Sequence, residues 1–160
     1  MGKKRKEDVE LVLKKVFGPL GLGTICSEYK TLNFKFFEIN DCEIGYEIIS
    51  AFPEQPKPLS LSWWEEFTEV VAKVATPYFL LVTERPLDFV IEGSEKLDER
   101  ILKTSIPTHY AAPYSFTTIF VVNISTLKTR TEIESLIERA KGLLETLVKD
   151  EKNLASWPRN

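Results

Sequence analysis

The 160-residue chain is predicted to fold as one α+β domain, an antiparallel sheet of about five strands flanked by helices. Apolar residues recur at helical spacing in three segments, and short β-prone runs come in pairs separated by turn residues. The composition, 43% hydrophobic and 28% charged, is that of a globular chain. We expect residues 8–157 to form the domain, between a flexible basic tail at 1–7 and a C-terminal tail at 158–160.

The first helix is predicted over residues 8–17, where apolar residues recur every three to four positions. Gly18 and Pro19 follow this segment and end it. The glycine-rich stretch 18–23 follows a helix instead of joining a strand to one, and it lacks the Gly-Lys-Ser/Thr ending of a phosphate-binding loop. We therefore interpret it as a turn.

A first hairpin is predicted from two β-prone runs, residues 34–39 and 43–49. Asn40 and Asp41 separate these runs, and both residue types tolerate the conformations of a tight turn. The two strands should pair antiparallel. Apolar and polar residues alternate in the second run, which predicts one buried and one solvated face.

The second helix is predicted from Ser62 and Glu65, which are spaced as a capping box, and from the apolar stripe that follows them to Val74. Thr76 and Pro77 end this segment. We expect the helix to lie on the sheet.

A second hairpin is predicted from residues 78–83 and 87–92, with Glu84-Arg85-Pro86 as the turn. Apolar residues in the following segment, 94–104, are spaced as on a short helix. Residues 105–115 contain two prolines and are predicted to be irregular.

The last two elements have the strongest patterns in the chain. Residues 116–124 are apolar and β-branched nearly throughout, which predicts a central strand. Thr129 and Glu132 are spaced as a capping box, and the apolar stripe after them runs to Val148, about five helical turns.

The predicted order is therefore αββαββ(α)βα. This order resembles the profilin-like arrangement of roadblock, longin and sensor-type domains, in which helices flank a five-stranded antiparallel sheet. The resemblance is one of topology, because no motif of those families is matched. A ferredoxin-like arrangement is the alternative.

Composition and charge limit the partners and the compartment. The formal net charge is −3, so the chain has no overall positive field for nucleic acid, and nucleic-acid binding is disfavoured. No apolar run reaches the roughly 20 residues that a membrane crossing needs, and the basic start is not followed by the apolar region of a secretory signal. We expect a cytoplasmic protein without a cofactor. One glutamine and one methionine, with many Lys and Glu, are typical of proteins from hot environments.

Candidate catalytic residues are few. His109 is the only histidine, so histidine-dependent catalysis would need it. A metal-dependent nuclease would place carboxylates and a lysine on neighbouring strands, and Asp88, Glu92 and Lys96 are the weak candidates for that arrangement. Their spacing fits it poorly, because Glu95 and Lys96 are adjacent, so no metal site is predicted.

Three tryptophans are the candidates for contacts with another protein. Trp63 and Trp64 lie side by side in the second predicted helix, and Trp157 follows the last helix. Tryptophan is favoured at the centres of protein interfaces, although core packing is the alternative for the first two. The margins of the predicted sheet also offer edge strands for pairing with another copy.

Three functions follow as hypotheses. The first is a non-catalytic protein-interaction domain that self-associates, because no set of catalytic residues converges in the sequence. The second is a metal-dependent nuclease or hydrolase that uses Asp88, Glu92 and Lys96. The third is a small-ligand sensor, in which the 105–115 loop closes a pocket that contains His109, Tyr110 and Tyr114.

Overall fold

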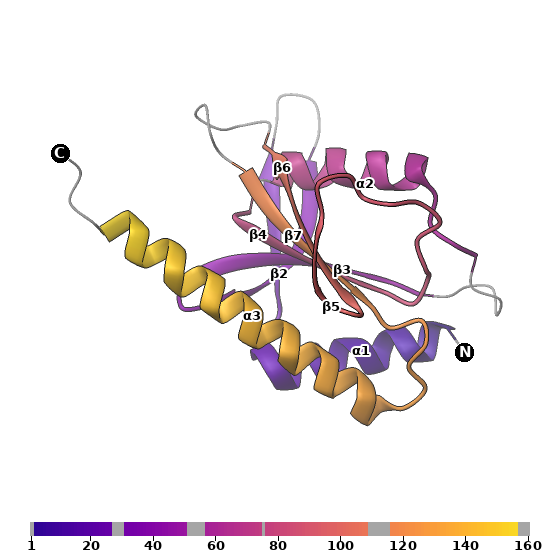
Figure 1. The fold of residues 1–160 in the computed structure, drawn as a ribbon. Coiled ribbons are helices and arrows are strands. Elements are labelled where there is room, and N and C mark those ends of the chain that lie inside the picture. Colours follow the sequence, from indigo (N-terminus) through magenta and orange to yellow (C-terminus); the bar gives the residue numbers. More distant parts are fainter. Residues whose placement is uncertain (1, 27–30, 51–56, 75, 109–115, 157–160) are drawn as a thin grey trace.

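The computed structural model describes residues 2–26, 31–50, 57–74, 76–108 and 116–156, and it confirms the predicted α+β class (Figure 1). Within these residues three helices and seven strands follow one another along the chain. In chain order they are α1 (Gly2–Phe17), β1 (Gly21–Cys26), β2 (Thr31–Ile39), β3 (Cys42–Ile49), α2 (Leu61–Val74), β4 (Tyr78–Thr83), β5 (Glu95–Asp98), β6 (Ile101–Pro107), β7 (Phe116–Asn123) and α3 (Arg130–Ser156).

The strands form one mixed sheet in the order β1-β2-β3-β4-β7-β6-β5. Strands β3, β4 and β7 run parallel, whereas the pairs on either side of them are antiparallel. The predicted five-stranded antiparallel sheet is therefore wrong, both in its number of strands and in the direction of its central strands. The profilin-like analogy and the ferredoxin-like alternative, which are antiparallel arrangements, do not describe it. Strands β3 and β4 are parallel because α2 connects them, and a helical crossover joins neighbouring strands of the same direction.

The first predicted hairpin is confirmed. Strands β2 and β3 pair antiparallel, and Ile39 lies opposite Cys42 at the turn. Asn40 and Asp41 take φ values of 48° and 65°, the left-handed conformation that these two residue types tolerate best after glycine.

The N-terminal region differs from its prediction at two points. Helix α1 begins at Gly2, so it includes residues that the sequence assigns to a flexible tail. The turn predicted at 18–23 is wrong from Gly21 onward, because strand β1 begins there and pairs with β2. Gly18 follows the helix as predicted: its φ is 92°, and its amide donates to the carbonyl oxygen of Lys14 at 2.9 Å.

The second predicted hairpin and the short helix after it are wrong. Residues 87–92 do not pair with β4; instead, Leu87 forms a bridge with Leu59, whose amide donates to the Pro86 carbonyl at 2.7 Å. The Asp88 amide donates in turn to the Leu59 carbonyl at 3.1 Å, so the start of this segment pairs with the residues before α2 instead of with β4. Strands β5 and β6 take the place of the helix predicted at 94–104. Strand β6 continues to Pro107, into the stretch predicted as irregular, while residues 109–115 lie outside the described part.

The last two elements match their predictions. Strand β7 lies between β4 and β6, as expected of a central strand. Thr129 and Glu132 form the predicted capping box of α3: the Glu132 amide donates to Thr129 Oγ1 at 3.2 Å, and the Thr129 amide donates to Glu132 Oε1 at 3.3 Å. At α2 the cap is Ser60 instead of the predicted Ser62, since Ser60 Oγ accepts from the Trp63 amide at 3.2 Å.

The helices cover the two faces of the sheet unequally. Helices α1 and α3 pack side by side on one face, joined by an ion pair of 2.8 Å between Lys15 and Glu134, and α2 alone lies on the other (Figure 1). We call these the α1/α3 face and the α2 face. The core of the α1/α3 face is the larger, and Phe37, Leu80 and Phe120 are among its fully buried side chains. A smaller core beneath α2 contains Trp64, Val71, Phe79, Leu81, Ile91, Ile119 and Val121.

Candidate interaction site

An apolar groove runs between α2 and strands β2 and β3 on the α2 face. Its volume is about 320 Å³, at the lower end of the range of small-molecule sites. From the sheet it is lined by Asn33, Phe34, Lys35, Tyr46, Glu47, Ile49 and Phe79, and from α2 by Trp63, Glu66, Phe67, Val70, Val71 and Val74. We call it the α2 groove. Most of its lining is hydrocarbon or aromatic.

Helix α2 forms one wall of the groove because its apolar residues cover more of the helix surface than the single stripe that faces the core. Trp64 and Val71 point into the core beneath the helix. Trp63, Phe67 and Val70 follow at i, i+4 and i+7, which places them along the flank of the helix that faces the groove. The rings of Trp63 and Phe67 stack, with centroids 5.0 Å apart and planes 10° apart. Val70 is 45% exposed.

Beside the groove, the sheet carries two phenylalanines that lie over glycines of the edge strand. Phe34 is paired with Gly23, and Phe36 with Gly21. A Cβ atom at Gly21 would come within 2.8 Å of the Phe36 ring, and one at Gly23 would meet the Phe34 ring. The two glycines therefore let the rings lie on β1, as small residues do where a neighbour approaches closely. Both rings stay half-buried and form an apolar shelf next to the groove.

The charges at the groove are mainly negative. Glu47 and Glu66 both line it. The Glu47 side chain is exposed, but the neighbouring residues partly desolvate its carboxyl group. This burial raises the pKa of the Glu47 carboxyl, against the opposing effect of Lys6 and Lys35. Lys35 contacts Glu10 of α1 at 3.5 Å.

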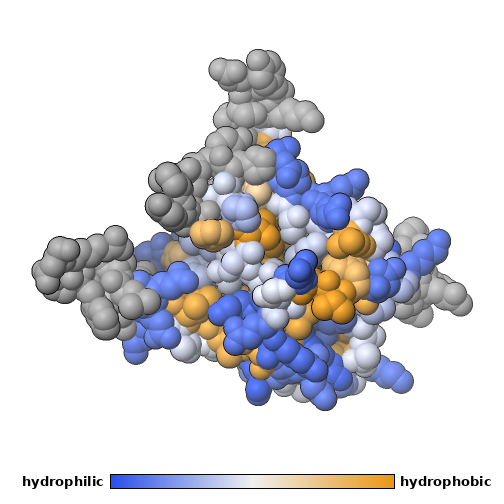
Figure 2. Space-filling model, turned by 45° about the horizontal axis from the view of Figure 1, so that its top comes forward, coloured by the Kyte–Doolittle hydropathy of each residue, from blue (hydrophilic) through white to orange (hydrophobic). Residues whose placement is uncertain are grey.

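The two edge strands of the sheet differ in character. Strand β5, with the sequence EKLD, is short, carries three charged residues and has an irregular register between Lys96 and Asp98. Charges and irregularity of this kind protect an edge from pairing with another chain. Strand β1, with the sequence GLGTIC, has no charged residue, and its Leu22 is 70% exposed. Figure 2 shows hydrophobic residues reaching the surface in separate patches between hydrophilic ones.

The tryptophans predicted as contact residues have different positions. Trp64 is 8% exposed and belongs to the core, which is the alternative stated for it. Trp63 is half-buried and lines the α2 groove. Trp157 lies outside the described residues, as do His109, Tyr110 and Tyr114 of the predicted ligand pocket.

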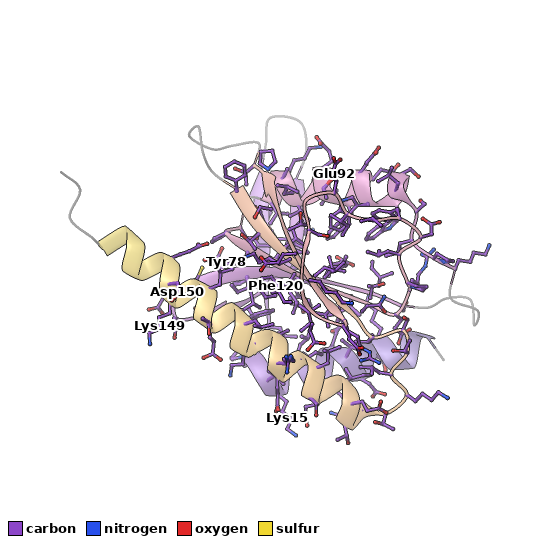
Figure 3. All side chains as sticks on the ribbon, in the orientation of Figure 1. Lys15, Tyr78, Glu92, Phe120, Lys149 and Asp150 are labelled. Atoms are coloured by element: carbon purple, nitrogen blue, oxygen red, sulfur yellow. The ribbon has the colours of Figure 1, made fainter. Side chains whose placement is uncertain are left out.

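The weak catalytic candidates stand on different elements. Asp88 and Glu92 are exposed residues of the irregular segment after β4, and Lys96 is an exposed residue of β5. Glu92 lies on the same side of the sheet as α2 (Figure 3). Within the described part of the chain, no three His, Cys, Asp or Glu side chains are grouped closely enough to hold a metal ion.

The residues that sequence reasoning missed are those of the shelf and the groove. Phe34, Phe36, Glu47 and Val70 were not singled out, because strand β1 was not predicted and no groove could be placed beside it. One signal was present: glycines at 21 and 23 and phenylalanines at 34 and 36 have the same spacing of two residues, the period of one strand face.

Comparisons of the chain with protein-family models, with curated proteins and with solved structures find no match. Among the described residues, no helix has the length and apolar character needed to cross a membrane.

Proposed function

We propose that this chain is a protein-interaction domain that forms a homodimer through its edge strand β1. The observation that carries the proposal is the contrast between the two sheet edges: β5 is charged and irregular, whereas β1 is uncharged and presents an exposed leucine. An unprotected edge strand offers unpaired backbone N–H and C=O groups to a further strand.

Pairing of β1 with β1 of a second copy fits the symmetry of most homodimers. Two antiparallel copies of one strand are related by a two-fold axis, so each copy uses the same surface. The six residues of β1 are paired with β2 along their whole length without a shift in register. Leu22, which projects from β1 on the α1/α3 face, would add an apolar contact to the backbone hydrogen bonds.

Size-exclusion chromatography with light scattering tests this proposal. The wild-type chain should have the mass of a dimer that dissociates on dilution. Leu22→Lys should shift the equilibrium toward monomer by about tenfold or more, because each copy would bring a lysine into the contact in place of an apolar side chain.

Leu61→Lys is the matched control, since Leu61 is an exposed leucine on α2, away from β1. It should leave the mass unchanged. A wild-type chain that stays monomeric from micromolar to millimolar concentration would rule the dimer out. Equal masses for wild type and Leu22→Lys would exclude β1 as the contact.

A further inference from the structure

Within the described part of the chain, the sheet beside α2 carries no second helix on the α2 face. Helix α2 lies over the core residues of β4 and β7, namely Phe79, Leu81, Ile119 and Val121. Neighbouring strands are roughly 4.8 Å apart, so β2 lies about 10 Å from β4 in the plane of the sheet. Packed helices are separated by about 8–10 Å. A helix beside α2 would therefore rest on β3 and β2, and within the described residues none does, whereas the α1/α3 face carries two helices.

The surfaces that such a helix would contact are apolar on both sides. The flank of α2 presents Trp63, Phe67 and Val70, and the sheet presents the half-buried rings of Phe34 and Phe36. The α2 side chains and Phe34 stand on the two sides of the α2 groove, and Phe36 lies on the same face of β2 as Phe34. Grooves of this kind bind an amphipathic helix through anchors at i, i+3 or i+4, and i+7.

The charge of the groove indicates which helix would fit. The carboxylates of Glu47 and Glu66 line it, and both residues are exposed. Lys35, the cation in the lining, contacts Glu10. An occupant with Lys or Arg beside its apolar face would pair with these carboxylates, whereas an acidic one would be repelled.

We propose that the α2 groove binds an amphipathic helix of a partner protein, whose apolar face is flanked by Lys or Arg residues. The helix lies alongside α2 and over Phe34, with its apolar residues between the two walls and its basic residues toward Glu47 and Glu66. This inference rests on the groove alone, so it holds or fails separately from the dimer formed through β1.

A peptide titration tests the inference. The probe is a 14-residue helical peptide, as long as α2, with Leu on one face and Lys beside it. Its Leu/Glu counterpart has the same apolar pattern, and a scrambled Leu/Lys peptide has the same charge. The Leu/Lys helix should bind with micromolar affinity, at least about tenfold more tightly than the other two peptides, and should change the fluorescence of the groove tryptophan Trp63.

Two valines offer a matched pair of variants. Val70 lines the groove at 45% exposure, and Val90 is 88% exposed outside the lining. Val70→Lys should weaken binding of the Leu/Lys helix by about tenfold or more, because a charge enters the apolar contact, whereas Val90→Lys should leave it unchanged. The Glu47→Gln/Glu66→Gln variant should reduce the preference for Leu/Lys over Leu/Glu.

Three results would overturn the inference. The first is equal binding of the Leu/Lys and scrambled peptides, which would mean attraction by charge alone. The second is equal binding to wild type and to Val70→Lys when circular dichroism shows the variant to be folded. The third is no binding of the Leu/Lys helix up to millimolar concentration. This result would overturn the inference even if the groove bound small apolar molecules.

Discussion

Tyr46 and Tyr78, on the neighbouring strands β3 and β4, are both buried on the α1/α3 face but have different surroundings. Burial, with Glu10 and Glu47 nearby, raises the pKa of Tyr46 to about 12. Burial also raises the pKa of Tyr78, with a further increase from the Glu151 carboxylate, which accepts a hydrogen bond from the Tyr78 hydroxyl. Both phenols therefore stay neutral at physiological pH. Tyr78 points toward the C-terminal half of α3 (Figure 3).

The hydrogen bond from Tyr78 to Glu151 should stabilise the docking of α3. We expect Tyr78→Phe to lower the free energy of unfolding by roughly 1 kcal/mol, because a charge-assisted but partly exposed bond is lost. Urea denaturation measures this change. In a double-mutant cycle with Glu151→Ala, the double variant should be about as stable as either single variant. Fully additive losses would show that the two side chains do not interact.

Glu47 should make stability depend on pH in the direction opposite to most carboxylates. Its folded-state pKa is raised above the ordinary value of 4.5. Its contribution to stability is therefore fully present below the unfolded pKa and is lost as pH rises through the folded pKa. Glu47→Gln should melt at a higher temperature than wild type near pH 7, and the difference should vanish near pH 4.

Glu43→Gln is the matched control for this prediction. Glu43 is exposed on the same face of β3 but lies outside the groove lining. Its substitution should leave the pH profile of melting close to that of wild type. A Glu47→Gln variant less stable than wild type at neutral pH would show that pairing with Lys6 and Lys35 outweighs burial.

At the scale of single elements, three glycines decide how strands and rings fit together. Gly21 and Gly23 allow β1 to lie beneath Phe36 and Phe34, which are half-buried. Gly45 of β3 lies beneath Phe79, which is buried and packs edge-on against Phe67 of α2. The first two sites border open space, whereas the third is enclosed by α2.

Alanine substitutions should separate these two environments. A Cβ at Gly45 would lie 2.7 Å from the Phe79 ring and 3.1 Å from Thr76 Oγ1, which donates to the Tyr78 carbonyl at 2.9 Å. We expect Gly45→Ala to cost about 2 kcal/mol of stability, because neither neighbour can move freely. Gly21→Ala should cost less than about 1 kcal/mol, since the half-buried Phe36 ring can swing outward. Chemical denaturation compares the two, and equal losses would contradict the account.

At the scale of the whole molecule, the elements with regular patterns were predictable and their connection was not. The turn at Asn40 and Asp41 and the cap at Thr129 each depend on neighbouring residues, so sequence alone indicates them. The parallel centre depends on where α2 returns the chain, which no local pattern determines. Strand β6 resembled a helix because Ile101 and Leu102 are both apolar, one on each covered face of the sheet.

The candidate site was less predictable than the fold. Trp63 was singled out for its residue type, and it does line the groove. The shelf formed by Phe34 and Phe36 needs β1 beside β2, and GLGTIC has too many glycines to indicate a strand. Strand β1 depends on its pairing with β2, which the local sequence does not indicate.

Amide hydrogen exchange on strand β1 at several protein concentrations is the most direct measurement of the central claim, that two copies of the chain meet along this edge. If they do, the outward-facing amides of Gly21–Cys26 should exchange more slowly as concentration rises, while those at the outer edge of Glu95–Asp98 should not change. Exchange along β1 that is fast and independent of concentration would contradict the claim.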